Sequence, residues 1–258
     1  MGCELRNRVE AVEPYRIDAQ GMHHRQLNET IRAALSAGYR EIILDNVNGQ
    51  RYIGAGISTP AYIEINGVPG NDLAVFMNGP TIRVHGNGQD GIANTMNSGT
   101  VIVDGSAGDV LGYGMRGGRL FVRGDVGYRV GIHMKEYREQ VPVLVVGGRA
   151  GAFCGEYMAG GVLVVLGLDR LPGQPLTGDY LATGMHGGVI YLRGRVAEHL
   201  LGKEVQMFDL NDQDWKLLGG LLDEFGNYFG VDAAELKKDQ YTKLLPVSHR
   251  PYGRLYVS

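Results

Sequence analysis

A segment of 19 residues recurs along the middle of the chain. Segments starting at Tyr62, Thr81, Thr100 and Arg119 follow one another at this spacing. A propeller blade of about 40 residues is twice as long, and a strand–helix–strand crossover needs about 30 residues. The period therefore predicts a solenoid in which each repeat is one coil. With insertions after residue 54, near 135–140 and at 168–175, the frame gives eight strand starts: Glu41, Tyr62, Thr81, Thr100, Arg119, Val143, Val162 and Val189.

Two positions of the repeat are aliphatic in every copy. The second position is Ile42, Ile63, Ile82, Val101, Leu120, Leu144, Leu163 and Ile190. The fourth position is Leu44, Ile65, Val84, Val103, Val122, Val146, Val165 and Leu192. Alternate side chains of a strand share a face, so both columns are predicted to point into the coil. A methionine column downstream is predicted to fill the interior: Met77, Met96, Met115, Met134, Met158 and Met185.

The sixth position of the repeat is Asn46 in the first copy and glycine in every later copy. The glycines are Gly67, Gly86, Gly105, Gly124, Gly148, Gly167 and Gly194. Only glycine enters positive φ without a steric penalty, and asparagine is the next most tolerant residue. We therefore predict a structural corner at this column, with positive φ, where each coil turns.

The segments that flank the repeat carry helical patterns. Residues 23–37 place Leu27, Ile31 and Leu35 at a spacing of four, and residues 212–229 are amphipathic. A shorter helix is predicted at 232–237 and an extended tail at 244–258.

These patterns predict an all-β fold, a single-stranded right-handed parallel β-helix (solenoid) of about eight rungs, with helical N- and C-terminal caps. Three parts are expected: residues 1–40 hold an N-terminal strand and capping helix, 41–205 the β-helix repeats, and 206–258 the C-terminal helices and extended tail.

Composition narrows the function. The formal net charge of -3 gives no reason to expect nucleic acid or an anionic membrane surface as partner. Two cysteines, Cys3 and Cys154, cannot by themselves build a disulfide framework or an iron–sulfur cluster, and they favour a reducing cytoplasm. No apolar run approaches the ~18 residues of a membrane span.

Short motifs that resemble catalytic or cofactor sites are better explained by the repeat. Residues 86–91 match G-x-G-x-x-G, but another coil follows where a dinucleotide fold needs a helix. The seven histidines lack zinc-binding spacings, and Cys154 lies among apolar and small residues, as buried thiols do. We expect no catalytic, cofactor-binding or metal-binding residue in this chain.

Several glycine-rich stretches resemble a known family. The pattern Gly108-x3-Gly112-x-Gly114, with GNGQDGIANTMNSG at 86–99 and GSAGDVLGYGMRGG at 105–118, is similar to the glycine-repeat (GXGXG) domain at the C-terminus of the glutamate synthase large subunit. The likeness extends from about residue 15 to 256 and is greatest to the stand-alone form of that domain.

The resemblance implies a non-catalytic scaffold role in glutamate formation. In that family an amidotransferase domain releases ammonia, and a synthase domain carries FMN and an iron–sulfur cluster, while the β-helix holds the two together and helps to shape the ammonia path. Here residue 2 is Gly2, so the N-terminal nucleophile cysteine is lacking. We therefore expect an amidotransferase-type subunit and an FMN-binding synthase-type subunit as partners, with FMN and the cluster on those chains.

Two other readings remain open. A related complex, such as N-methylglutamate synthase or formylmethanofuran dehydrogenase, uses a similar solenoid subunit. An independent enzyme working in a coil groove is disfavoured, because the fifth column has no acidic cluster: Asp45, Asn66, His85, Asp104, Arg123, Gly147, Leu166 and Arg193.

Two segments that break the period are the candidate partner contacts. One is the insertion at 135–141, with Tyr137 and Arg138, since insertions in solenoids often map to binding faces. The other is the C-terminal tail, with Arg250, Tyr252 and Tyr256. The tail has an alternative role, in which it packs back on its own solenoid as a cap, and self-association is left open.

Overall fold

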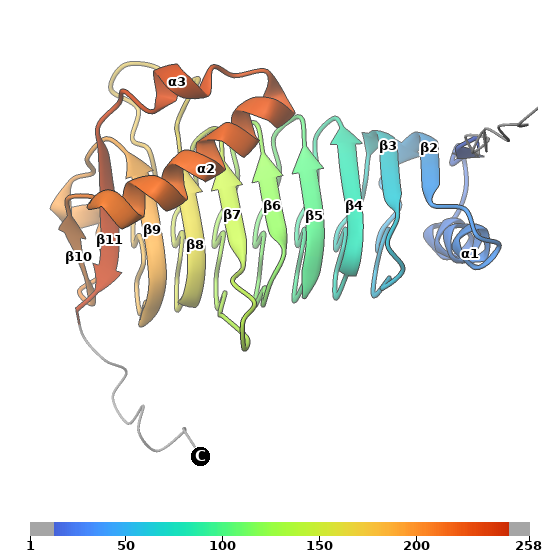
Figure 1. Ribbon diagram of the computed structural model, residues 1–258, viewed down its shortest axis with the longest axis horizontal. Helices are drawn as coiled ribbons and strands as arrows, with labels where there is room; N and C mark the ends of the chain where they lie inside the picture. The colour runs from blue at the N-terminus through green and yellow to red at the C-terminus, as the bar shows by residue number, and fades with distance from the viewer. Residues whose placement is uncertain (1–12, 248–258) are drawn as a thin grey trace, which may run out of the picture.

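The computed structural model describes residues 13–247. They form an all-β parallel solenoid of about six turns (Figure 1). Nine strands follow one another in chain order along the rod, each paired in parallel with the next. They are β1 (Tyr15–Asp18), β2 (Glu41–Asn48), β3 (Tyr62–Val68), β4 (Asn78–His85), β5 (Ser98–Val103), β6 (Arg119–Val122), β7 (Val143–Val146), β8 (Ala159–Val165) and β9 (Gly187–Arg193).

The predicted register of the repeat is confirmed. Tyr62 pairs with Thr81, Thr81 with Thr100, and Thr100 with Arg119, and every other predicted start is paired in the same frame. The number of full turns is smaller than the number of strand starts. The reason lies at the two ends, since helix α1 (His24–Ser36) stands between β1 and β2, and the chain leaves the regular path after β9.

The interior is filled as the alternating columns predict. Every residue of the second, fourth and methionine columns is fully buried, and all of them belong to one continuous apolar cluster. Leu27, Ile31, Ala34 and Leu35 of α1 join the same cluster. The N-terminal coil therefore closes on a helical face instead of a strand and turn.

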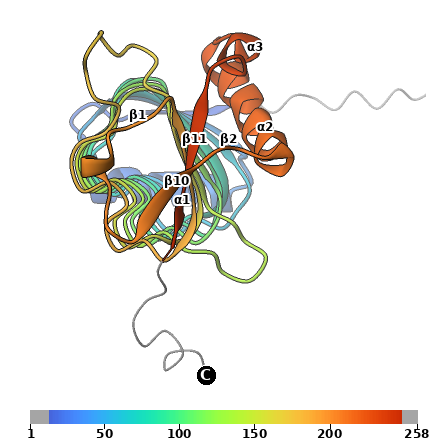
Figure 2. The ribbon, with the colours of Figure 1, turned by 90° about the vertical axis from the view of Figure 1, so that its left-hand side faces the viewer.

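The sequence predicted that the C-terminal helix caps the end of the rod. Helix α2 (Asp212–Phe229) instead lies along the outside of the sheet across β6 to β9 (Figures 1 and 2). The reason is the third position of the repeat, which is polar at Glu64 and Arg83 and then becomes apolar: Phe121, Val145, Val164 and Tyr191. These side chains form a second core with Leu218, Leu221, Leu222 and Phe225 of the helix.

Antiparallel strands complete the C-terminal end. After α2 the chain forms the short helix α3 (Ala233–Leu236) and then β11 (Tyr241–Pro246), which pairs with β9 on one side and with β10 (Val205–Phe208) on the other. A 3-10 turn, η1 (Glu198–Leu200), precedes β10. Residues 244–246 of the predicted tail thus belong to the sheet.

The positive φ predicted for the column of corner glycines is found at only part of the column. Gly67, Gly86, Gly167 and Gly194 have positive φ, whereas Gly105, Gly124 and Gly148 do not. At these three positions a Cβ atom would collide with the preceding coil. At Gly105 it would lie 2.2 Å from Asn87 Oδ1 and 2.8 Å from the Gly86 carbonyl oxygen. Close backbone approach therefore selects glycine there.

Candidate functional site

Seven coils turn through three left-handed residues that alternate with residues whose φ is not positive. In the coil after β5 these are Val110, Gly112 and Gly114, with φ of 53°, 65° and 56°. The same three positions recur with positive φ in seven coils. The first position is Tyr52, Asp72, Gly91, Val110, Arg129, Phe153 and Tyr180; the middle is Gly54, Ala74, Ala93, Gly112, Gly131, Gly155 and Ala182; the third is Gly56, Phe76, Thr95, Gly114, His133, Tyr157 and Gly184.

The middle position of this turn faces the interior and accepts only glycine or alanine. Ala74, Ala93 and Ala182 are fully buried. A Cβ atom on Gly112 would already lie 2.8 Å from Leu144 Cδ1. The two outer positions are exposed or half-buried except at Gly91. Several of them carry large side chains, although a side chain in the left-handed region costs about 1–2 kcal/mol. The turn therefore presents its outer positions as a surface.

Aromatic rings stack along this surface from one coil to the next. His133 lies parallel to Tyr157, with ring centroids 5.3 Å apart, and meets the edge of Tyr113 at 5.8 Å. Phe153 stacks on Tyr180 at 4.8 Å, and the guanidinium of Arg129 lies 4.9 Å from the centre of the Phe153 ring. Tyr113, Tyr157 and Tyr180 are 42%, 45% and 58% exposed. Exposed aromatic side chains that lie next to one another are typical of an interaction surface.

A groove of about 300 Å³ runs beside the first row of rings. It is lined by residues of five successive coils: Thr95, Tyr113, Gly114, Arg116, His133, Lys135, Tyr157, Ala159 and His186. None of these lining residues is acidic. His186 Nδ1 lies 3.1 Å from the Gly184 carbonyl oxygen, which only accepts, so Nδ1 is the donor in this contact. The groove combines aromatic faces with positive charge.

The predicted contact residues of the insertion lie next to this groove in sequence. Tyr137 and Gln140 form a two-residue bridge, and Arg138 at their turn has a φ of 57°. The Arg138 guanidinium lies 5.2 Å from the centre of the Tyr137 ring, which is 47% exposed. The tail residues Arg250, Tyr252 and Tyr256 lie outside the described residues.

A polar cluster on the outside of the sheet is closed upon itself. His85 Nδ1 lies 2.7 Å from Asp104 Oδ2, and His85 Nε2 lies 3.1 Å from Glu64 Oε1. Arg83 forms an ion pair with Asp104 at 3.0 Å and donates to the carbonyl oxygen of Tyr228, at the end of α2. Each member already has a partner on a neighbouring strand or helix. The cluster therefore ties α2 and three strands together.

A second polar cluster, which is largely buried, links α2 and β11 to the solenoid. The Tyr191 hydroxyl donates to Asp214 Oδ1 at 2.8 Å, and Lys243 forms an ion pair with Asp214 Oδ2. Desolvation raises the pKa of Asp214, but the hydrogen bonds from the Asn211 backbone, Lys243 and Tyr191 outweigh it and hold this pKa below its ordinary value. The folded protein therefore stabilises the ionised form of the Asp214 carboxylate.

The predicted buried thiol is found where expected. Cys154 is fully buried in the interior cluster, and burial raises its pKa to about 12. Within residues 13–247, no three or more histidine, cysteine, aspartate or glutamate side chains gather as a metal site would need. The helices of that same part of the chain are all too short or too polar to span a bilayer.

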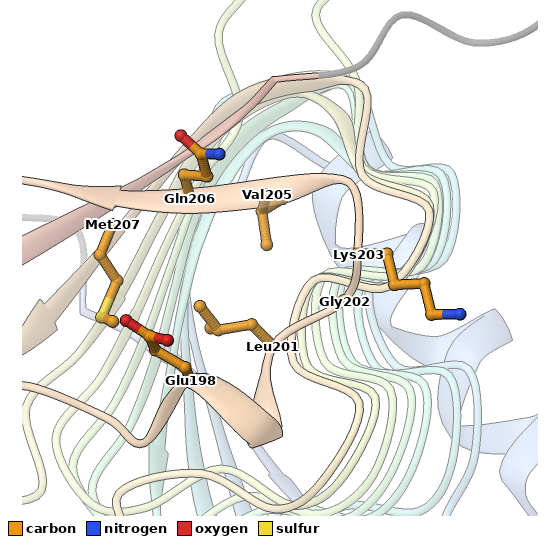
Figure 3. A pocket seen from close by; sticks show the side chains of 7 residues that line it. All are labelled: Glu198, Leu201, Gly202, Lys203, Val205, Gln206 and Met207. Atoms are coloured by element: carbon orange, nitrogen blue, oxygen red, sulfur yellow. The ribbon is translucent and has the colours of Figure 1, made fainter.

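The C-terminal end of the rod is hollowed. A cavity of about 500 Å³ lies between η1 and β10, and Figure 3 shows Leu201 and Val205 pointing into it while Lys203 points away. Leu201 and Val205 pack on the interior core. The cavity therefore marks the unfilled last coil, where the column of inward side chains ends.

The sequence interpretation missed the aromatic rows of the turn. It identified the G-x-G-x-G spacing but treated it as a family motif. The signal was present in the same columns, since the outer glycine positions are replaced by aromatic or histidine side chains in neighbouring copies: Phe76, His133, Phe153, Tyr157 and Tyr180.

Comparison with known proteins places the fold in a family. Residues 23–248 match the family described as GXGXG motif. Over 257 residues the chain is 47% identical to an uncharacterized protein of Methanocaldococcus jannaschii, covering 96% of this chain and 98% of that protein.

A solved structure shares the architecture. A chain of the formyltransferase/hydrolase complex (FhcABCD) from Methylorubrum extorquens, crystallised with methylofuran, matches with a TM-score of 0.58 and 19% identity, covering 88% of this chain and 89% of that chain. This likeness concerns the fold alone. The sequence match over nearly the whole chain, together with the alternating left-handed turn that its glycine pattern encodes, shows that the protein belongs to the GXGXG motif family.

Proposed function

We propose that the chain is a non-catalytic scaffold subunit of a glutamate-synthase-type complex. It holds an amidotransferase-type subunit and an FMN- and iron–sulfur-carrying synthase-type subunit, and it helps to shape the path of ammonia between them in the cytoplasm. The observation that carries this proposal is the aromatic and basic face on the turns of an otherwise regular rod. A face of this kind binds protein, since tyrosine and arginine are enriched among interface hot spots.

The rod is built to keep its shape. The backbone N–H of Gly105, Gly124, Gly148 and Gly167 each donates to the corner glycine of the preceding coil, at 2.9 Å in every case. Side chains also form hydrogen bonds between neighbouring coils; for example, Asp109 Oδ1 accepts from Tyr128 N at 2.9 Å. Polar side chains of the coils are thus used to join neighbouring coils. A stiff body with fixed spacing between its faces suits a subunit that positions two others.

The partner classes follow from the resemblance to glutamate synthase. Membership of the GXGXG motif family supports that resemblance without naming the complex. The structural neighbour is itself one chain of an assembly with several subunits, which supports a role in an assembly here.

Purification of an affinity-tagged chain from its own organism tests the proposal. We expect it to bring down a flavoprotein and an amidotransferase-like subunit in fixed ratio, and the assembly to form glutamate from glutamine and 2-oxoglutarate. The chain expressed alone should be colourless and without glutaminase activity. A chain that migrates alone in its own cell extract, or that binds flavin by itself, would contradict the scaffold role.

A second candidate is the corresponding subunit of a related complex, of the N-methylglutamate synthase or formylmethanofuran dehydrogenase type. This candidate is supported by the fold that the protein shares with a chain of the formyltransferase/hydrolase complex. The same purification separates a complex of the formyltransferase type, because a formyl-transferring subunit would then accompany the chain in place of the amidotransferase. The product that the purified assembly forms separates N-methylglutamate synthase from glutamate synthase.

A further inference from the structure

The groove beside the stacked rings has an unusual balance of charge. Arg116 and Lys135 line it, and neither forms an ion pair within residues 13–247. By contrast, Arg129, in the same coil as Lys135, is paired with Glu156 at 2.9 Å. A cation left without a partner beside exposed apolar rings suits an occupant that brings the negative charge.

The shape of the groove indicates an extended occupant. Its lining comes from five successive coils, from Thr95 to His186. Since adjacent strands lie about 4.8 Å apart, four such steps make the groove about 19 Å long. An extended peptide of about six residues covers the same length, because it rises about 3.3 Å per residue. A small anion would occupy only one step of this length.

The chemistry disfavours nucleic acid, the other extended anion. A groove that follows a phosphate backbone carries a continuous line of cations. Here Arg116 and Lys135 are the only lining residues that carry a permanent positive charge, and the whole chain has a net charge of -3. The ring faces of Tyr113, His133 and Tyr157 instead suit apolar or aromatic side chains that alternate with acidic ones in a peptide.

We propose that this groove binds an extended acidic segment, with aromatic or apolar side chains, of a partner polypeptide. The inference rests on the proposed function, because it assigns a contact face to one of the partner subunits. Carboxylates of the segment pair with Arg116 and Lys135, and its apolar side chains lie on the row formed by Tyr113, His133 and Tyr157. The insertion that holds Tyr137 and Arg138 begins at Lys135, one of the lining residues.

Peptide binding tests the inference on the isolated chain. The probe is a fluorescein-labelled peptide of about ten residues that alternates glutamate with phenylalanine, long enough to span the groove. A matched peptide with lysine for glutamate and an oligothymidylate of similar length serve as controls. We expect only the acidic peptide to raise the fluorescence anisotropy, and salt to weaken its binding because exposed charges are screened.

Charge reversal locates the binding. Arg116→Glu with Lys135→Glu should weaken the acidic peptide about tenfold or more, since like charges then face one another. Lys203→Glu with Lys216→Glu makes the same change of net charge at exposed positions away from the groove, and it should leave the affinity unchanged. Failure of the acidic peptide to bind, equal weakening by both double variants, or preference for the oligothymidylate overturns the inference.

A crosslink in the assembly separates this inference from the scaffold role. A photoreactive phenylalanine in place of Tyr157, in the tagged chain purified with its partners, should label a segment rich in aspartate and glutamate on one partner subunit. A label on a neutral or basic segment overturns the inference while the scaffold role stands. If no partner assembles with the chain, the scaffold role fails, and the peptide measurement still decides the groove.

Discussion

Replacing Gly105 with alanine should destabilise the protein through steric contact with the preceding coil. The added Cβ would lie 2.2 Å from Asn87 Oδ1, 2.8 Å from the Gly86 carbonyl oxygen and 2.9 Å from its carbon. Two of these atoms are backbone, so the coils themselves must separate. The φ of Gly105 is not positive, and the cost is therefore independent of backbone conformation.

The expected loss of stability follows from the contacts that are disturbed when the two coils move apart. Overpacking a well-packed site costs about 1–3 kcal/mol. Two hydrogen bonds of 2.9 Å cross the same contact, from Gly105 N to Gly86 O and from Ser106 N to Asn87 Oδ1, and each contributes about 1 kcal/mol. We expect a loss of about 3 kcal/mol, which lowers the melting temperature by roughly 6–12 °C in a domain of this size.

Gly114→Ala is the matched control. Gly114 has a φ of 56°, and its Cβ would meet nothing closer than Thr95 Oγ1 at 3.8 Å. Both variants change glycine to alanine, so their effects on the unfolded chain cancel in the comparison. The left-handed conformation should cost Gly114→Ala about 1 kcal/mol or less after that gain. Thermal melts followed by circular dichroism measure both. Equal losses, or a harmless Gly105→Ala, would refute the steric account of the corner.

Three further outcomes follow from the buried contacts. Phe225→Ala should remove α2 from the sheet at a cost of about 3–5 kcal/mol, because Phe225 is fully buried in the second core; urea unfolding measures the loss, and a change below about 1 kcal/mol would contradict the packing. Asp214→Asn should destabilise the protein at neutral pH, and the difference from wild type should shrink as the pH falls from about 5 towards 2. The sign follows because the folded-state pKa lies below the ordinary 3.8, so its stabilisation exists above that value and disappears once the carboxylate is protonated; a constant difference across this range would contradict the ion pair. In a Cys3→Ser variant, Cys154 should remain unreactive to a disulfide reagent at pH 8 until denaturant is added, because the thiol is buried and its pKa is raised to about 12; prompt reaction in the native state would contradict that burial.

The interior of the solenoid was predictable from the sequence because it depends on local alternation. Side chains two residues apart share a face, so the columns that begin with Ile42 and Leu44 had to face the same side, and both are fully buried in every coil. The register followed from the period, because coils of equal length bring equivalent residues side by side, as at Tyr62 and Thr81.

The position of α2 was harder to predict because it depends on contacts between segments that are far apart in the sequence. Its amphipathic pattern was visible in Leu218 and Leu222, but the pattern of a helix does not say which surface it covers. The apolar third position at Phe121 and Val145 held that information. The reason for glycine at Gly105 was equally non-local, because the colliding atoms belong to the neighbouring coil.

The fold leaves few positions of each coil free to vary, and these positions are the ones that can determine which partner is bound. The second and fourth strand positions and the middle of the turn are taken by the interior, and the sixth position by the close approach of coils. The outer turn positions meet solvent and tolerate residues as different as Thr95, His133 and Tyr157 in the same left-handed conformation. A solenoid of this family can therefore change its partner without changing its core, by altering the outer turn columns and the insertions beside them. In this chain those columns carry stacked rings, and Arg116 and Lys135, which have no ion pair within residues 13–247, follow them in the sequence. For this reason we assign the partner contact to the turns and not to the sheet.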